Sequence, residues 1–169
     1  MTGEVFIARR VYFSFHYAND INRSMIVRNS WVTQGKEAAG YFDKAEFEKI
    51  KKTGDKAVHR WINSQLNGTS VTVVLIGRET LNRPFVKYEI CESINRGNAI
   101  IGVYIHNIKD MLTRKTSIKG NAHTIIGTDE YETSVYFDEI CDGLYDYVLD
   151  NGYKNLGTWI ENAAKKHNK

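Results

Sequence analysis

The chain has 169 residues, of which 42% are hydrophobic and 25% are charged, and this balance is typical of a globular protein with one core. Its formal net charge of +3 is too small to indicate nucleic acid as the main ligand, and its basic clusters lack the interleaved aromatic residues of single-strand binders. The N-terminal residues lack the apolar core of a signal peptide, and no apolar stretch approaches the length that spans a bilayer. We therefore expect a cytoplasmic protein with no membrane partner.

The first third of the chain predicts two strands and two helices. Residues 10–15 are aromatic and β-branched, as in a strand that ends in a polar cluster. A helix is expected over about 21–28, and residues 39–42 are a weak candidate for the second strand. Asp43 then has the character of a helix N-cap, because Glu46 follows three residues later.

The middle of the chain alternates between helix and strand. A helix is expected over about 55–66, and the nearly unbroken apolar run 71–76 predicts a strand that is buried on both faces. Pro84 suits the first position of the next helix, which we expect to end near Arg96. Residues 99–105 predict a second buried strand. This rhythm predicts an α/β fold with a parallel sheet and helices on both faces.

The pattern loosens after His106. Residues 107–134 carry few large apolar side chains, so we expect a long loop or insertion there, and such loops are often functional. Residues 134–137 predict a short last strand. The apolar residues within 144–149 and 159–163 then suggest two closing helices.

Cysteine and histidine positions give no sign of a metal site. Cys91 and Cys141 lie far apart and outside any CxxC pair, so we expect two free thiols with a structural role. The five histidines show no metal-ligand spacing among themselves or with the cysteines. We therefore expect no bound metal.

Glu89 lies about one and a half turns inside the helix that begins at Pro84. At about 100° per residue it projects beside the apolar stripe of Val86, Ile90 and Ile94. A carboxylate near the carboxyl end of a buried strand is placed where open α/β sheets bind ligands. The alternative is an ordinary solvated helix glutamate.

Polar side chains follow all four strands of the predicted sheet, and loops at one sheet edge can bring them together. They are Ser14, His16 and Asp20 after the first strand, Asp43 after the second, Arg78, Glu79 and Thr80 after the third, and His106 and Asn107 after the fourth. Asp20 and Asp43 could equally be helix caps, Ser14 could bond to backbone, and His106 could be a structural histidine. The chain contains no GxGxxG, GxxxxGK[ST] or GxSxG motif, which argues against a Rossmann dinucleotide site, a P-loop and a hydrolase elbow.

Three segments carry a resemblance to the TIR-domain family, in its bacterial TIR-like branch. They are the aromatic, serine-containing strand 11–17, the apolar strand 71–77, and the aromatic-x-x-x-Glu run Phe85–Glu89. The run onward to residue 103 is especially similar to the TIR-like proteins of Thoeris anti-phage defence systems. The family pattern commonly has Trp and then Cys where this chain has Phe85 and Val86. The resemblance implies one TIR-like domain over 1–169, with a flavodoxin-like core at about 9–107 and a C-terminal loop and helix extension at about 108–169.

The resemblance also implies an activity. Enzymatic TIR domains cleave the nicotinamide–ribose bond of NAD⁺, and the glutamate at the position of Glu89 is their essential carboxylate. NAD⁺ is then the substrate, and no separate cofactor is expected. Thoeris TIR proteins are associated with a cyclised ADP-ribose signal that activates a separate NAD⁺-depleting effector after a phage component triggers them. Self-association on activation and a movable loop, here roughly residues 43–52, are further family expectations.

The chemistry of such a reaction suits a carboxylate at position 89, because the ribose becomes an oxocarbenium-like cation. Phe15, Tyr17 and Phe42 are candidates to stack on nicotinamide or adenine, although core aromatics are an equal alternative. The full set of expected substrate-binding residues is Ser14, Phe15, His16, Tyr17, Phe42, Asp43 and Arg78. Two other functions stay open: a non-catalytic TIR interaction module, and a nucleoside deoxyribosyltransferase-like enzyme that also uses a glutamate.

Overall fold

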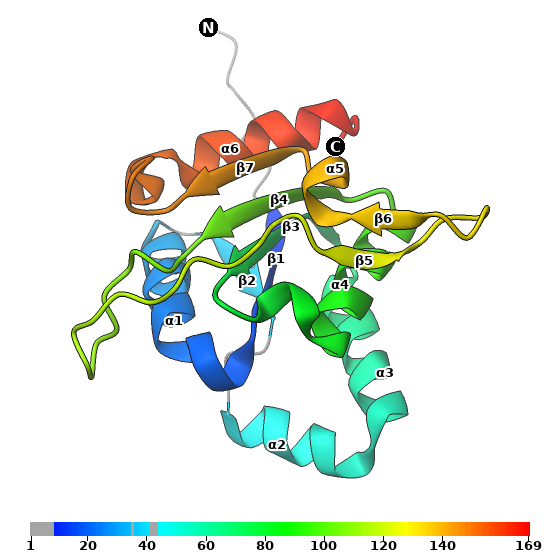
Figure 1. The fold of residues 1–169 in the computed structure, drawn as a ribbon, viewed down its shortest axis with the longest axis horizontal. Coiled ribbons are helices and arrows are strands. Elements are labelled where there is room, and N and C mark those ends of the chain that lie inside the picture. The colour runs from blue at the N-terminus through cyan, green and yellow to red at the C-terminus, as the bar shows by residue number, and fades with distance from the viewer. Residues whose placement is uncertain (1–8, 35, 41–43) are drawn as a thin grey trace, which may run out of the picture.

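The computed structural model describes residues 9–34, 36–40 and 44–169 (Figure 1). Within these residues the main sheet has five strands in the order β2-β1-β3-β4-β7, and every pairing is parallel. The strands are β1 (Arg10–Ser14), β2 (Glu37–Ala39), β3 (Thr69–Ile76), β4 (Ala99–Tyr104) and β7 (Gly143–Asp146). This is the flavodoxin-like order, which confirms the predicted fold.

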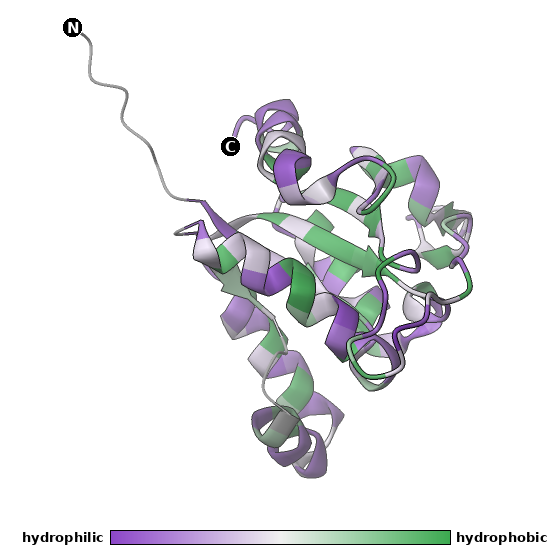
Figure 2. Ribbon diagram, turned by 90° about the vertical axis from the view of Figure 1, so that its left-hand side faces the viewer, coloured by the Kyte–Doolittle hydropathy of each residue, from purple (hydrophilic) through white to green (hydrophobic). Residues whose placement is uncertain are grey.

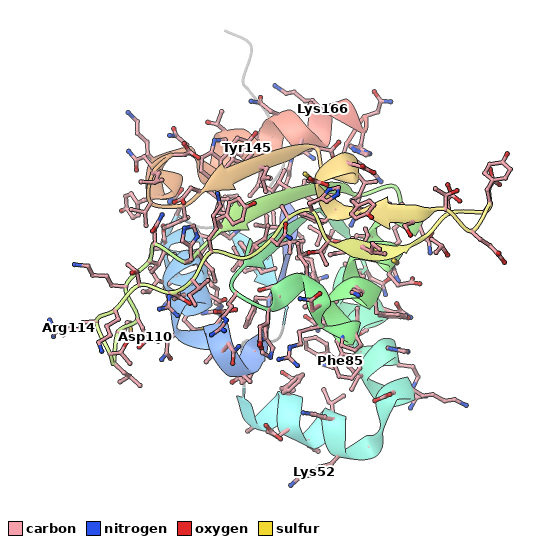
Figure 3. All side chains as sticks on the ribbon, in the orientation of Figure 1. Lys52, Phe85, Asp110, Arg114, Tyr145 and Lys166 are labelled. Carbon is pink, nitrogen blue, oxygen red and sulfur yellow. The ribbon has the colours of Figure 1, made fainter. Side chains whose placement is uncertain are left out.

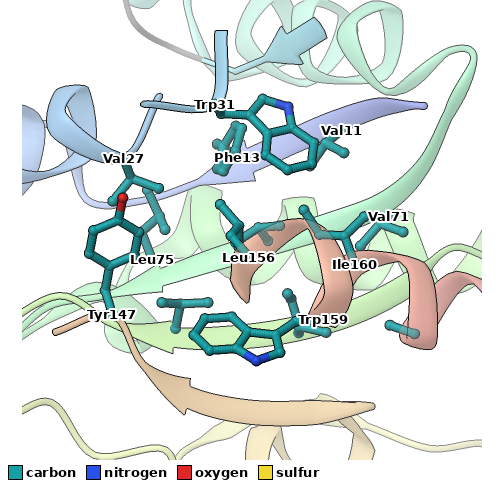
Figure 4. Packing of buried hydrophobic residues seen from close by; sticks show 14 of the residues in the cluster. Val11, Phe13, Val27, Trp31, Val71, Leu75, Tyr147, Leu156, Trp159 and Ile160 are labelled. Carbon is teal, nitrogen blue, oxygen red and sulfur yellow. The ribbon is translucent and has the colours of Figure 1, made fainter. Parts of the chain in front are cut away.

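Helices cover both faces of the sheet. They are α1 (Tyr17–Thr33), α2 (Lys44–Thr53), α3 (Asp55–Leu66), α4 (Pro84–Asn95), the short α5 (Phe137–Ile140) and α6 (Gly152–Lys166). The core between the sheet and α1 and α6 contains Trp31, Leu156 and Ile160, as Figure 4 shows. Helices α3 and α4 pack on the opposite face. Figure 2 shows the apolar strands enclosed by helices with mostly hydrophilic outer surfaces.

The sequence pattern explains the central elements. In β3, Val71 and residues 73–76 have no exposed surface, because the helices bury this strand on both faces. Helix α3 has the predicted bounds and buries Val58, Ile62 and Leu66 at helical spacing. Pro84 is the first residue of α4, where its missing N–H costs nothing.

Four elements differ from the sequence prediction. Residues 37–39 form the second strand, two residues before the predicted start, and α1 extends from Tyr17 to Thr33 rather than over 21–28. Residues 134–136 form a strand, β6, but it pairs with β5 (Ile125–Thr128) in a separate antiparallel sheet. The last strand of the main sheet is β7, at 143–146, where a helix was expected. A four-residue edge strand with partly exposed side chains has no clear alternation to reveal it.

The long segment after β4 is held down on the rest of the fold. The guanidinium of Arg23, on α1, donates to the carbonyl oxygens of Ile108 and Lys115 at 2.8 and 2.9 Å. Gly120 crosses the end of β3 so closely that a Cβ there would overlap the carbonyl oxygen of Gly77. Both cysteines are free thiols, as expected. Among the described residues, no helix combines the length and the apolar character needed to cross a membrane.

Candidate functional site

A cavity of about 510 Å³ lies at the carboxyl end of β1. Its walls come from the start of α1, from α2 and from the first turns of α4, and these helices converge in Figure 1. The lining residues are Phe15, His16, Tyr17, Ala18, Ile21, Phe47, Glu48, Lys51, Arg83, Pro84, Phe85, Val86 and Glu89. The cavity therefore combines aromatic walls with a few ionisable groups at the sheet edge where open α/β folds bind ligands.

Four of the residues predicted from the sequence meet in this cavity: Phe15, His16, Tyr17 and Glu89. Of the other predicted substrate-binding residues, Ser14 is fully buried beside Glu89 and Arg78 is exposed, and neither lines the cavity. Phe42 and Asp43 lie outside the described residues. The structure therefore brings four of the eight predicted site residues together in one cavity and leaves Arg78 outside it.

Glu89 is almost fully buried, with 3% of its surface exposed, which excludes the solvated helix glutamate. Its Oε2 atom is buried without a hydrogen bond of normal geometry among the described residues. Burial raises the pKa of Glu89 to about 8, and the nearby hydroxyls of Tyr12 and Ser14 oppose that shift only in part. The predicted apolar stripe is wrong at Ile94, which is 43% exposed. Glu89 itself belongs to the buried face of α4.

The turn of α4 that carries Glu89 is fixed to the sheet by two hydroxyls. Ser93 Oγ donates to the Glu89 carbonyl oxygen at 2.7 Å and lies 2.6 Å from Thr72 Oγ1 on β3. On the neighbouring face of α4, Tyr88 stacks on His59 of α3 with ring centroids 3.9 Å apart. The position of the carboxyl group is thus set by packing on both the sheet and α3.

The rim of the cavity carries the charged groups. Arg83 Nη2 donates to Glu79 Oε2 at 2.6 Å, and Asn19 Nδ2 on α1 donates to the same oxygen at 3.1 Å. His16 precedes α1, and its Nδ1 atom is buried without a partner among the described residues. Burial and the charge of Arg83 lower the pKa of His16, and Glu79 opposes them. His16 is therefore neutral at physiological pH.

Helix α2 contributes residues that were not predicted for the site. Residues 44–53, which cover most of the expected movable loop at about 43–52, form a regular helix. The Phe47 ring stacks on Tyr17 with centroids 5.0 Å apart, and Lys51 lines the cavity one turn later. Their spacing of four residues puts both side chains on one face of a helix, which was a usable signal. Nothing in the sequence indicates which part of the fold that face would contact.

The remaining candidates lie apart from the cavity. Asp20 is buried next to Thr80 Oγ1, and burial raises its pKa to about 6. His106 is buried near Asp146, which also accepts a hydrogen bond from Asn107 at 2.9 Å. In the part of the chain that the structure describes, no group of three or more His, Cys, Asp and Glu side chains is arranged to hold a metal ion.

Comparison with known proteins places this site in a family context. A family model described as the TIR-like domain of the Thoeris protein ThsB matches residues 12–110, a span that contains every residue lining the cavity. ThsB1 of Bacillus cereus (strain MSX-D12) is 37% identical over 191 residues, which cover 91% of this chain and 100% of that protein. The name of that relative describes it as a candidate cyclic ADP-D-ribose synthase.

Proposed function

The chain belongs to the TIR-like domain family of Thoeris ThsB proteins, and we propose that it cleaves the nicotinamide–ribose bond of NAD⁺ and closes the ADP-ribose portion into a cyclic product. The observation that carries this proposal is Glu89, the most buried ionisable residue lining the cavity, whose Oε2 atom has no hydrogen-bond partner of normal geometry within the described part of the chain. A buried carboxyl group with a strongly shifted pKa in an aromatic-walled cavity is typical of a catalytic residue. The name of the 37% identical relative supports the cyclic product.

The proposed reaction begins with cleavage of the bond between ribose C1′ and the nicotinamide nitrogen. The bonding electron pair leaves with nicotinamide, which departs neutral, so no general acid is needed. The positive charge that develops on the ribose is stabilised by the Glu89 carboxylate. An adenine nitrogen or a hydroxyl of the same ADP-ribose then attacks C1′ and closes the ring. When the attacking group is a hydroxyl, its proton is released to solvent. Attack by water would instead give linear ADP-ribose.

The walls of the cavity favour the cyclic outcome. Phe15, Tyr17, Phe47 and Phe85 line it, so a large part of its wall is aromatic surface that binds water poorly. The stacked pair of Tyr17 and Phe47 offers flat surfaces on which a nicotinamide or adenine ring can lie. A folded dinucleotide with both rings against these walls would bring its adenine close to the reacting ribose.

Glu89 must be ionised to stabilise the ribose cation, although its pKa of about 8 keeps most of it protonated in the free protein at neutral pH. Bound NAD⁺ brings a positive charge on its nicotinamide ring into the cavity. An opposite charge at close range favours the ionised carboxyl group and lowers its pKa. Substrate binding and loss of the Glu89 proton are therefore coupled in this proposal.

The biological role proposed here is that of a signal-producing enzyme in antiviral defence. Membership of the Thoeris ThsB family supports this role. The cyclic product would act on a separate effector that depletes NAD⁺, and a phage component would switch on the synthesis. We also propose that activation involves self-association of the chain.

The test is the substitution Glu89→Gln, which keeps the size of the side chain but removes its charge. We expect loss of NAD⁺ consumption and of cyclic product by chromatography, using protein activated with phage lysate. Glu92→Gln, on the same helix but away from the cavity, is the matched control and should keep the wild-type rate. Wild-type turnover in Glu89→Gln would exclude Glu89 as the catalytic residue. Defence that survives this variant would favour an interaction module, and base exchange on free nucleosides would favour a deoxyribosyltransferase-like enzyme.

A further inference from the structure

Arg83 lines the same cavity as Glu89 and precedes it by six residues. Its guanidinium is anchored on one side, where Nη2 donates to Glu79 Oε2 at 2.6 Å. Asn19 holds the same carboxylate oxygen from α1 at 3.1 Å, so Glu79 links α1 to the start of α4 through Arg83. This link gives the guanidinium a defined place at the cavity rim.

Most of the hydrogen-bonding capacity of Arg83 is unused. A guanidinium has five N–H donors, and the bond to Glu79 is the one that Arg83 makes among the described residues. Its side chain is 44% exposed, so the free donors are open to a ligand in the cavity. A planar fork of donors matches phosphate oxygens in two-point hydrogen bonding.

A second cation faces the cavity from another wall. Lys51 lies on α2, whereas Arg83 lies just before α4, and both line the cavity. His16 also lines the cavity, and burial and the charge of Arg83 lower its pKa, so it adds no third cation. Glu48 on α2 opposes these cations, so the attraction for an anion centres on the guanidinium and its directed donors rather than on a broad positive field.

The position of Arg83 relative to Glu89 suits a phosphorylated ribose. Six residues of α-helix rise by about 9 Å along the helix axis. Because both side chains line one cavity, a ribose beside Glu89 and its 5′-phosphate at the guanidinium would fill the gap between them. Binding the phosphate at Arg83 would fix C1′ of that ribose near the carboxyl group.

We propose that Arg83 binds a phosphate of the dinucleotide and so positions the reacting ribose beside Glu89. This inference rests on the proposed function and adds to it a specificity: ligands with a 5′-phosphate on the nicotinamide ribose are preferred over the same ligands without it. Arg83 acts as a positioning residue, because it holds the substrate and takes no part in bond cleavage.

The experiment compares two ligands that differ only in that phosphate, nicotinamide mononucleotide and nicotinamide riboside. Ligand-observed NMR titration of the folded protein gives a dissociation constant for each. A charge-assisted hydrogen bond contributes about 1.5–3 kcal/mol, so Arg83→Ala should weaken binding of the mononucleotide by about 10- to 100-fold. Binding of the riboside should not change. Arg83→Lys keeps the charge but not the planar fork, and should give an intermediate loss.

Arg60→Ala, an exposed arginine on α3 outside the cavity, is the control and should bind both ligands like the wild type. Equal weakening of both ligands in Arg83→Ala would show a general role in shaping the cavity and would overturn the proposal, as would no change in either. If the wild type bound neither ligand nor NAD⁺, the proposed NAD⁺ site itself would fail. If the wild type binds NAD⁺ but Arg83→Ala still prefers the mononucleotide over the riboside as strongly as the wild type does, only the phosphate contact would be contradicted.

Discussion

Glu89 combines two demands that oppose each other. The proposed chemistry needs a carboxylate where water is scarce, and folding disfavours an acid buried without a partner. The raised pKa of Glu89 reflects that conflict. Above pH 4.5 the unfolded chain releases the Glu89 proton, whereas the folded protein keeps it up to about pH 8. The nearby hydroxyls of Tyr12 and Ser14 relieve the conflict in part.

This conflict predicts how stability depends on pH. Between pH 4.5 and about 8 the folded state binds more protons than the unfolded state, so the free energy of unfolding should fall as pH rises through this window and level off above it. Glu89→Gln removes the titrating group and with it this part of the slope. At pH 7 the group costs the wild type about 3 kcal/mol relative to its value at low pH.

Urea denaturation of both proteins across the pH range measures the difference. The slope against pH is the useful quantity, because a buried glutamine amide adds an offset that does not depend on pH. Asp20 titrates in both proteins and cancels in the comparison. Parallel curves for wild type and Glu89→Gln would show that folding does not raise the pKa of Glu89, and Glu92→Gln should follow the wild type.

The cavity depends on a tight junction between two elements, the start of α1 and the end of β3. Gly77 follows β3, and its N–H donates to Thr80 Oγ1 at 2.8 Å. Asp20, in the first turn of α1, packs closely on Gly77, and a Cβ added at position 77 would overlap the Asp20 carboxyl group. Only glycine permits this approach. The junction sets where His16 and Tyr17 lie relative to the loop that leads to Arg83.

Gly77→Ala should therefore destabilise the protein by about 1–3 kcal/mol, as expected for a side chain forced into a packed site. Asp20→Ala makes room for the new methyl group, so the double variant should lose less stability than the sum of the two single variants. Urea denaturation measures all three. Gly157→Ala, in α6, is the matched control: its new methyl group would press only on the flexible end of Lys36 and would meet Trp31 at ordinary contact distance, so no loss is expected. If the losses in the free energy of unfolding for Gly77→Ala and Asp20→Ala were additive in the double variant, the two side chains would not be in steric contact.

The central elements were predictable because their signals are local and dense. Residues 71–76 and 99–105 are apolar runs too strong for any other interpretation, and Pro84 marks the start of α4. Strand β7 was missed because its four residues are half-exposed, and its pairing with β4 is a long-range contact. The cavity was half predictable for the same reason. Residues that directly follow a strand can be predicted as site candidates from the sequence, but the face of α2 that closes the cavity cannot.

At the scale of the whole molecule, the cavity is closed on one side by α2, a helix at the periphery of the fold. Helix α2 lies at one end of the fold in Figure 1 and packs mainly on α3, where Trp61 Nε1 donates to Glu46 Oε1 at 3.1 Å. Its contact with α1 is the stack of Phe47 on Tyr17. The lining residues Glu48 and Lys51 remain exposed, and Figure 3 shows side chains of α2 projecting away from the sheet. Among the described residues, the cavity of a single chain is therefore open to water along α2.

An open cavity predicts an enzyme that depends on its own concentration. The ribose cation reacts with whichever nucleophile reaches it first, so cyclisation needs a site from which water is excluded. A second copy packed over α2 would exclude it, and if the two copies used different surfaces the packing could continue into filaments. We expect the rate per chain and the ratio of cyclic to linear product to rise together with protein concentration. Chromatography of the products and light scattering over a dilution series, with and without phage lysate, measure both.

Full rate and an unchanged product ratio in dilute, trigger-free monomer would contradict closure by assembly. A cavity that one chain cannot close would also protect the host, because the enzyme would leave its NAD⁺ intact until copies gather.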